Sequence, residues 1–307
     1  MSMHSLITDV VGTAQELVEK DSRFGKVLHR FFQNRLAVAG LVMTGIYLLI
    51  GVLGPVLAPH DPTTIDAASR FQPPSLEHPF GTDTRGRDIL SRVMFGARQS
   101  LYVAIIVVTV SSFVGVSLGL IAGFFRGLVD ETVMRFIDVL FAFPAILLAL
   151  LIITILGPGL NRAIVALSVA FIPIMVRVTR GSAISIREED YILAARAYGE
   201  TSYNIMFREM LPNLVSVVMV QATITFAFSI LAEAGLSYLG LSAQFPTITW
   251  GLMISEGQSD IVRAPWATFF PGLAIMLTVL GLTFLGVGLR DALDPKTDVD
   301  SNVGGGL

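Results

Sequence analysis

Residues Ile192–Asn213 read ILAARAYGETSYNIMFREMLPN and separate two long apolar stretches of the chain. The segment carries four charged side chains and has Gly199 near its middle. Helical spacing on both sides of a glycine predicts two helices joined by a turn, since glycine readily adopts the left-handed conformation that ends a helix. The segment is therefore interpreted as a polar helical insert between two membrane-spanning stretches.

Six apolar runs are bounded by polar residues, glycine or proline. A helix needs about 20 apolar residues to cross the hydrocarbon of a bilayer. The fourth run is short and contains Pro173, so we extend it to about Leu160 and Arg180. The chain thus predicts an all-α polytopic membrane protein with six transmembrane helices. The runs are Leu36–Ala58, Leu101–Phe125, Phe136–Leu156, Ala163–Val176, Leu214–Leu239 and Trp266–Leu289.

The composition excludes several classes of function. Hydrophobic residues make up 53% of the 307-residue chain and charged residues 15%, against roughly 25% charged residues in soluble domains. The net charge of −3 argues against a nucleic-acid partner. Without cysteine the chain has no disulfide, Cys-ligated zinc or thiol nucleophile. Its four histidines lack paired metal-ligand spacing, and no nucleophile–base pair is evident, so we expect neither a metal site nor catalytic residues.

Lysine and arginine bias predicts the orientation of the spans. Basic residues are more frequent in the segments that lie inside when both termini are cytoplasmic, although the first outside loop is also rich in arginine. A polar leader precedes the first span, which we expect to be uncleaved and to sit at the edge of a five-helix core. The expected organisation is a leader (1–35), a first span with an outer loop and interfacial helix (36–100), a core with a cytoplasmic loop at 185–213 (101–290), and a cytoplasmic tail (291–307).

The cytoplasmic insert has its own helix signals. Ser185 and Glu188 have capping-box spacing, which predicts a helix start. Thr201 or Ser202 can cap a second helix, and Pro212 marks the start of the fifth span. The first helix has a face of small and aromatic side chains, Tyr191, Ala194, Ala195 and Tyr198. Such a face permits close approach of another surface, but the pattern also fits a hairpin that packs only on its own bundle.

Five residues of the insert match a known coupling motif, E-A-A, three residues, Gly, nine residues, then I-x-L-P. They are Ala194, Ala195, Gly199, Leu211 and Pro212. The chain thereby resembles the inner-membrane permease subunits of binding-protein-dependent ABC importers. Leu193 and Glu209 replace the motif's Glu and Ile, which leaves the small-residue face and the glycine turn intact.

Further motifs resemble one branch of that family, the second, C-type permease subunit of dipeptide, oligopeptide and nickel importers. They occur in order between about residues 35 and 295. They read HPFGTDTRGRDILSRVMFGARQSL (His78–Leu101), RFIDVLFAFPAILLAL (Arg135–Leu150), ILAEAGLSYLGL (Ile230–Leu241), TWGLMISEG (Thr249–Gly257) and GLRDALDP (Gly288–Pro295).

The resemblance implies a type I importer permease fold in the cell inner membrane and a transport role without enzymatic activity. It implies a homologous second permease, two ATPase subunits that carry ATP and Mg, and an extracytoplasmic binding protein. The chain itself has no G-x-x-x-x-G-K-[ST] motif, so no cofactor is expected on it. The implied substrates are peptides, with nickel or glutathione as alternatives. The implied ATPase-coupling residues are Tyr191, Ala194, Ala195, Arg196, Ala197, Tyr198, Gly199, Ile205, Leu211 and Pro212.

Several polar residues outside the insert are candidates for function. Asp138 in the third span is expected to pair with Arg135, fixing helix packing or touching the substrate path. Glu233 in the fifth span either makes structural hydrogen bonds or lines the path. Gly119 and Gly123 have the spacing of a close helix contact. Residues Arg87–Arg98 fit an amphipathic interfacial helix, and Trp250 and Trp266 suit the headgroup zone. Candidate contacts with the binding protein are Arg87, Arg92, Trp250 and Glu256.

Two other classes of membrane protein fit the composition. A secondary transporter or channel would need no ATPase, but typically shows paired broken helices, an ion relay or repeated halves. A membrane-embedded enzyme would need a metal or nucleophile cluster within its spans. The sequence shows none of these features clearly.

Overall fold

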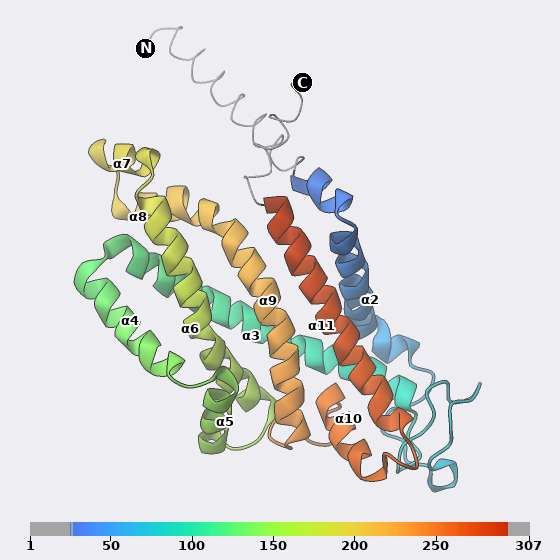
Figure 1. The fold of residues 1–307 in the computed structure, drawn as a ribbon. Helices are drawn as coiled ribbons and strands as arrows, with labels where there is room; N and C mark the ends of the chain where they lie inside the picture. The colour runs from blue at the N-terminus through green and yellow to red at the C-terminus, as the bar shows by residue number, and fades with distance from the viewer. Residues whose placement is uncertain (1–24, 26, 294–307) are drawn as a thin grey trace.

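The computed structural model describes residue 25 and residues 27–293, so most of the expected leader and tail lie outside the described part (Figure 1). Within that part the chain is helical, with no strand and one isolated β-bridge between Thr82 and Asp88. The all-α prediction is confirmed. The elements are α2 (Arg35–Leu57), η1 (Ala67–Ser69), α3 (Ile89–Phe125), α4 (Gly127–Phe141), α5 (Ala145–Leu156), α6 (Leu160–Arg187), α7 (Asp190–Ala197), α8 (Ser202–Asn204), η2 (Ile205–Met210), α9 (Leu211–Tyr238), α10 (Trp250–Gly257), η3 (Gln258–Asp260) and α11 (Trp266–Leu293).

Five helical segments are long and apolar enough to cross a membrane: α2, α3, α6, the continuous run Ser202–Tyr238 and α11. The third expected span, Phe136–Leu156, is broken within its length, because α4 and α5 meet at an angle of 85°. Pro144 stands just before α5 and explains the break, since proline lacks an amide hydrogen and disfavours helical geometry in the preceding residue. Six spans result only if this bent pair counts as one.

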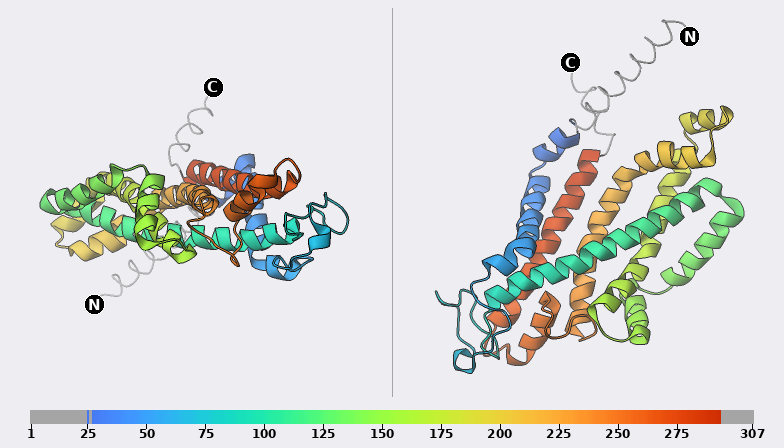
Figure 2. Two further views of the ribbon diagram at one scale, coloured as in Figure 1. Left: turned by 90° about the horizontal axis from the view of Figure 1, so that it is seen from below. Right: turned by 180° about the vertical axis from the view of Figure 1, so that it is seen from behind.

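Helix α3 runs without a break for 37 residues, about 55 Å at 1.5 Å per residue. It crosses the layer formed by α6, α9 and α11 obliquely (Figure 2). The helix expected at Arg87–Arg98 is therefore present from Ile89 onward, but it continues into the second expected span instead of ending before it. Asp88 caps the start of α3 by accepting a hydrogen bond from the Ser91 amide at 2.8 Å, and the helix continues through Gly96 into the second expected span.

Glycines of α3 bring this helix close to α6. A Cβ atom placed on Gly119 would lie 2.7 Å from both the Thr179 Cβ and the Val176 carbonyl oxygen. One placed on Gly123 would lie 2.6 Å from the Ala183 Cβ. The two backbones thus approach at a distance that only glycine allows, which confirms the close helix contact expected at this pair.

Helix α2 lies at the edge of the bundle and packs against α11 and α3 (Figure 1). A Cβ placed on Gly288 of α11 would lie 2.2 Å from the Ala37 Cβ, so this contact also depends on a small residue. The peripheral first span expected from the sequence is consistent with this position.

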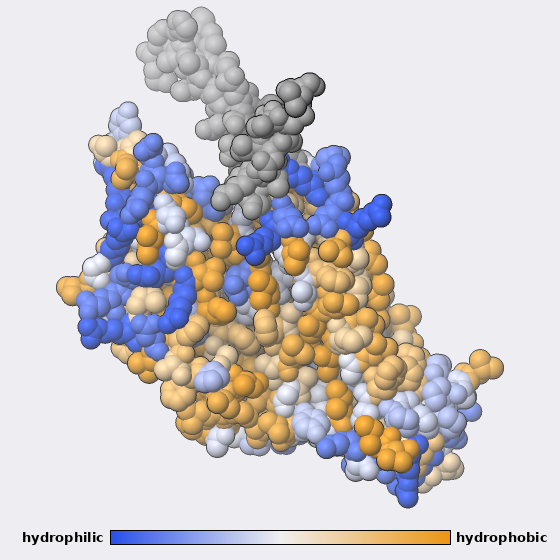
Figure 3. All heavy atoms as spheres, viewed as in Figure 1, coloured by the Kyte–Doolittle hydropathy of each residue, from blue (hydrophilic) through white to orange (hydrophobic). Residues whose placement is uncertain are grey.

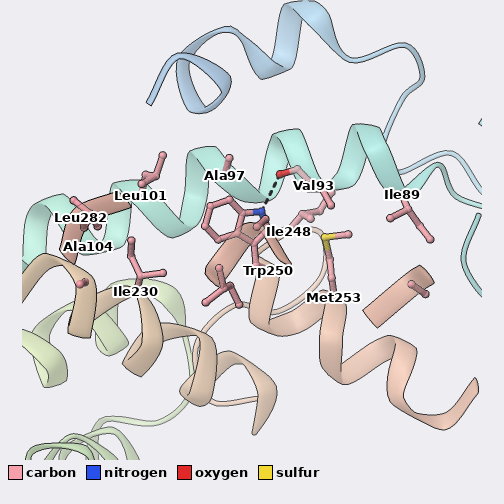
Figure 4. Packing of buried hydrophobic residues seen from close by; sticks show 14 of the residues in the cluster. Ile89, Val93, Ala97, Leu101, Ala104, Ile230, Ile248, Trp250, Met253 and Leu282 are labelled. Carbon is pink, nitrogen blue, oxygen red and sulfur yellow. Dashed lines mark hydrogen bonds between the residues drawn. The ribbon is translucent and has the colours of Figure 1, made fainter. Parts of the chain in front are cut away.

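At one end of the bundle a cluster of buried apolar residues surrounds Trp250 (Figure 4). The indole nitrogen of Trp250 donates to the Val93 carbonyl at 3.0 Å, and the ring meets Tyr47 edge-on with centroids 5.9 Å apart. Trp250 is fully buried, so its ring contacts protein and offers no surface to lipid headgroups. Trp266 is partly buried and donates to the Thr82 carbonyl at 3.0 Å, which ties the outer loop to α11.

The surface has the polarity of a membrane protein. Figure 3 shows hydrophilic residues gathered at opposite ends of the visible face and a broad apolar region between them. Large apolar side chains that are exposed on the spanning helices include Val52, Phe113, Phe136 and Ile155. Exposed apolar surface of this extent is unfavourable in water and favourable in lipid.

Candidate functional site

The polar insert begins where α6 ends. Helix α6 continues to Arg187, with Glu188 as its last cap, and α7 starts at Asp190. The predicted capping box is wrong, because the Ser185 hydroxyl donates back to the Gly181 carbonyl at 3.4 Å within α6. The connection between the two helices is therefore very short, and α7 projects at the end of the molecule (Figure 1).

One side of α7 is anchored to the bundle. Ile192 is fully buried in an apolar cluster with Leu120 and Phe124 of α3 and with Ile205 of η2. Ala195 packs against the same cluster. Burial of these side chains fixes how the helix lies on the bundle.

The opposite side of α7 is free. Tyr191, Ala194, Ala197 and Tyr198 are exposed, and the Tyr198 side chain is 90% exposed. Small side chains beside exposed aromatic rings give a surface that a partner can approach closely. The expected small-residue face is therefore present, except that Ala195 belongs to the anchored side.

Tyr191 links α7 to the start of α9. Its hydroxyl accepts a hydrogen bond from the Asn213 side-chain amide at 3.1 Å. Burial raises the pKa of Tyr191, and the carboxylates of Glu189 and Glu209 raise it further. The hydroxyl thus stays protonated at neutral pH.

Arg196, another residue assigned to the coupling set, faces the bundle. Its guanidinium lies 4.9 Å from the centre of the Phe124 ring. Glu188, in the connection between α6 and α7, forms an ion pair at 2.5 Å with Arg126, which lies between α3 and α4. Arg196 therefore contributes to the anchored side of α7 together with Ala195.

Gly199 makes the turn after α7. Its φ angle is +80°, and its amide donates to the Arg196 carbonyl at 3.0 Å. Thr201 then caps α8 by accepting from the Asn204 amide at 3.3 Å. The glycine turn and the threonine cap predicted from the sequence are confirmed.

The second helix of the insert is not separate from the fifth span. Residues Ser202–Tyr238 run continuously through the π-helical turn η2 into α9. The ring of Pro212 would collide with the Arg208 carbonyl in a regular α-helix, and the wider turn just before it relieves this clash. Ile205 is buried and Leu211 half-buried, so these two coupling candidates pack on the bundle, while Pro212 is exposed.

Asp138 does not pair with Arg135. The Arg177 guanidinium of α6 donates to the Asp138 carboxylate at 2.7 Å and lies 3.7 Å from the centre of the Phe141 ring. Arg135 instead pairs with Glu131, four residues earlier on the same helix. The expected local pair is wrong because Asp138 faces α6, but its expected role in helix packing fits this contact.

Glu233 lies inside the bundle with no exposed surface. Its carboxylate accepts hydrogen bonds from Ser237 at 2.6 Å and from Ser100 and Ser242 at 3.3 Å. These donors come from α9, α3 and the segment before α10, so the group joins three parts of the chain. The geometry supports the structural role of Glu233.

Arg87, Arg92, Asp83 and Glu256 form one ion-pair network. Glu256 accepts from Arg87 at 2.8 Å and from Arg92 at 2.6 Å. Asp83 accepts from Arg87 at 2.7 Å and also from Arg92. Both arginines are buried, as is Trp250, so none of the three offers a surface to a binding protein. Of the four expected contacts, only Glu256 is partly exposed.

The structure brings together three potential metal ligands. His60, His78 and Asp88 place one ligand atom each within 4.8 Å of the others. No local pattern predicts this group, because the residues are 18 and 10 positions apart and follow no ligand spacing. The expectation of no metal site was therefore based on spacing alone.

Comparison with known proteins places these features in a family. Residues 115–299 match the family described as "Binding-protein-dependent transport system inner membrane component", and residues 22–74 match the "N-terminal TM domain of oligopeptide transport permease C". In a solved structure of the MetNI methionine ABC transporter in inward-facing conformations, one chain matches with a TM-score of 0.54 and 20% identity, over 66% of this chain and 97% of that one. This likeness shows the fold of an ABC importer permease.

Curated relatives match over most of their length. The chain is 45% identical over 264 residues to the dipeptide transport system permease protein DppC of Alkalihalophilus pseudofirmus, covering 86% of this chain and 87% of the relative. It is 42% identical over 268 residues to the glutathione transport system permease protein GsiD of Pectobacterium atrosepticum, covering 87% and 89%. It is 35% identical over 286 residues to the oligopeptide transport system permease protein OppC of Bacillus subtilis, covering 93% and 94%. The chain belongs to the family of binding-protein-dependent transport system inner membrane components.

Proposed function

We propose that the chain forms half of the translocation pathway of an ATP-driven importer in the inner membrane. A homologous second permease supplies the other half, two ATPase subunits bind ATP and Mg, and an extracytoplasmic binding protein delivers the substrate. Family membership and the fold support this assignment. The role of the chain is conformational, since an importer needs two states that the ATPases bias through their contacts.

The observation that carries the proposal is the two-sided construction of α7. Ile192 anchors the helix in the bundle, while Ala194, Ala197 and Tyr198 face outward at its end. Because α7 connects directly to α6 and, through Gly199, to the continuous α8–α9 helix, a force on α7 reaches two spanning helices at once. We assign the outward face of α7 to the ATPase groove.

The orientation follows from the same assignment. The start of α2 and the end of α11 lie at the same end of the bundle as α7 (Figure 1). If α7 contacts cytoplasmic ATPases, both of these helix ends are cytoplasmic too. The network of Asp83, Arg87, Arg92 and Glu256 then lies on the side of the binding protein, where it braces the outer loop.

The substrate class that we propose is di- and oligopeptides. Relatives named for dipeptide and oligopeptide transport support this choice. Glutathione, itself a small peptide, is the substrate in the name of another relative, and nickel is a further alternative from the sequence resemblance. Uptake of labelled dipeptide, glutathione and nickel by cells that carry the complete importer would separate these substrates.

Substitutions on α7 test the coupling role. Ala194→Trp and Ala197→Trp add a large ring to the exposed face, where nothing in the bundle opposes it. Ala195 is a poorer choice because its side chain packs on the apolar cluster. Gly199→Val places a β-branched residue at a φ angle of +80°, which only glycine adopts easily. We expect normal membrane abundance of the permease with strongly reduced co-purification of the ATPases and reduced transport.

A matched control adds the same ring elsewhere. Val262→Trp changes a side chain that is 94% exposed, in the connection between η3 and α11. It should leave ATPase co-purification unchanged. If Ala194→Trp and Ala197→Trp retain the ATPases and transport at the wild-type rate, α7 is a surface hairpin and the coupling role is wrong. Transport that continues in cells without the ATPase genes would favour a secondary transporter.

A further inference from the structure

Three side chains with metal-binding donors converge in the outer loop. His60 follows α2, His78 comes from the loop after η1, and Asp88 is the cap at the start of α3. The His60 and His78 rings lie 4.7 Å apart, centre to centre. The folding of this loop, rather than any local spacing, places two imidazoles and one carboxylate around a common point.

One potential metal-ligand atom of this group, His60 Nδ1, makes no hydrogen bond among the described residues. His78 Nδ1 lies 3.0 Å from Asp88 Oδ1, and the second oxygen of Asp88 accepts from the Ser91 amide. His60 Nδ1 is shielded from solvent and has no hydrogen-bond partner among the described residues. It lies 3.8 Å from Asp88 Oδ2. A shielded polar nitrogen without a partner is unfavourable, so a ligand at this point would satisfy it.

The donor set and its spacing fit a transition metal. Two imidazole nitrogens and a carboxylate oxygen are a common three-residue set for Zn²⁺, with bonds of about 2.0–2.2 Å. Ligand atoms around such an ion lie roughly 3.3 Å apart in a tetrahedron. Here His78 Nδ1 lies 3.0 Å from one oxygen of Asp88 and His60 Nδ1 lies 3.8 Å from the other, and one ligand atom of each residue lies within 4.8 Å of the other two. We propose that His60, His78 and Asp88 bind a divalent transition-metal ion of the zinc class.

An open cavity beside His60 gives an ion access to the site, and a bound ion would connect two segments of the outer loop. His60 lines an open cavity of about 570 Å³, together with Pro55, Phe95 and Gln99, so an ion can reach the site from outside. Its side chain is 39% exposed, whereas His78 and Asp88 are buried. An ion held here ties the segment after α2 to the start of α3. It therefore stabilises the folded outer loop, by an amount that rises with the logarithm of its affinity.

The test uses the full-length chain, purified in detergent with a tag that contains no histidine and stripped with a chelator. Equilibrium dialysis against Zn²⁺ followed by elemental analysis measures the bound metal. We expect one ion per chain in the wild type and at least a tenfold weaker affinity in His60→Ala. His60 is the residue to change because its Nδ1 makes no hydrogen bond, so its loss breaks no contact of that atom in the fold.

The chain provides a matched control, because it has only four histidines. The double variant His4→Ala/His29→Ala removes the same number of imidazoles as His60→Ala/His78→Ala and should bind zinc like the wild type. Asp88 is left unchanged because it caps α3. Equal zinc binding by the wild type and His60→Ala, or none by the wild type, would overturn the proposal.

A second measurement tests the proposal on the wild-type chain, so it does not depend on whether His60→Ala folds. Zinc X-ray absorption of the wild-type chain reports its ligands directly, and we expect the scattering pattern of two imidazoles. A spectrum with oxygen ligands only would show that His78 and Asp88 form a plain hydrogen bond and that zinc binds elsewhere.

Discussion

The Arg180 guanidinium binds the Asp130 carboxylate with two hydrogen bonds, Nε to Oδ1 at 2.5 Å and Nη2 to Oδ2 at 2.6 Å. This pair joins α6 to the bent α4–α5 segment. Both side chains are partly buried, in contrast to the exposed pair of Glu131 and Arg135 that begins one residue further along α4. A two-pronged arginine–carboxylate contact fixes relative orientation as well as distance. The Asp130–Arg180 pair therefore sets how α4 lies against α6.

Neighbouring substitutions compare the two pairs directly. Asp130→Asn should lower the free energy of unfolding by about 1–3 kcal/mol, because it leaves Arg180 without its charged partner. Glu131→Gln removes an equal charge from an exposed pair and should change the free energy of unfolding by less than about 1 kcal/mol. Denaturant unfolding of the purified chain in mixed micelles measures both values. Equal effects of the two variants would show that the Asp130–Arg180 contact has no special role.

Much of the bundle could be predicted because lipid imposes a simple pattern. Apolar runs of about 20 residues mark spanning helices, and five of the six expected runs coincide with unbroken spanning helices. The run from Phe136 to Leu156 predicted one unbroken span because its residues remain mostly apolar through the bend between α4 and α5. Pro144 was a visible signal, but proline also occurs inside α6 and α11, where the helix continues. Only the packing of a helix against its neighbours decides whether a proline breaks the helix or is accommodated within it.

The candidate site was partly predictable for a similar reason. The turn at Gly199 follows from backbone sterics, which act locally. The partner of Asp138 and the position of Trp250 depend on contacts between distant segments, and no local rule selects Arg177 over Arg135 or the interior over the headgroup zone. His60, His78 and Asp88 likewise come together only through the tertiary folding of the outer loop.

The contact between α3 and α6 predicts opposite effects for two glycines. Gly119→Ala puts a methyl group 2.7 Å from the Thr179 Cβ and should lower stability by about 1–3 kcal/mol. Gly181→Ala, in the interior of α6, meets nothing within 4 Å. It should leave stability unchanged or raise it by up to about 1 kcal/mol, since alanine favours helix more than glycine does. Unfolding in mixed micelles measures both, and a harmless Gly119→Ala would mean that the helices are not in close contact.

The ion-pair network of the outer loop predicts a dependence on pH. Burial raises the pKa of Glu256, but Arg92 and Arg87 lower it more, so its pKa lies below the ordinary value of a glutamate. A carboxyl with a depressed pKa in the folded chain stabilises the fold above its unfolded pKa of about 4.3 and loses that contribution as pH falls through the folded pKa. Thermal stability should therefore drop on acidification below about pH 5.

Two glutamine variants isolate this contribution. Glu256→Gln should have a lower Tm than the wild type at neutral pH, and the difference should shrink as the pH is lowered. Glu77→Gln changes an exposed carboxyl in the same loop and should follow the wild-type curve. A constant difference between wild type and Glu256→Gln from pH 7 to about pH 3 would show that proton binding by Glu256 is not coupled to folding.

The orientation of the chain can be read from single cysteines, because the natural sequence has none. Leu76, in the loop between η1 and α3, and Ser202, at the start of α8, are both exposed. That loop lies at the opposite end of the bundle from α7 and α8 (Figure 1). Leu76 is preferable to Ser75, whose hydroxyl accepts from the His78 amide at 3.0 Å. With the α7 end in the cytoplasm, a membrane-impermeant maleimide should label Leu76→Cys in spheroplasts, and should label Ser202→Cys only after the membrane is opened. Labelling of both variants from the same side would contradict the proposed topology, and labelling of Ser202→Cys alone in intact spheroplasts would reverse it and separate α7 from any cytoplasmic ATPase.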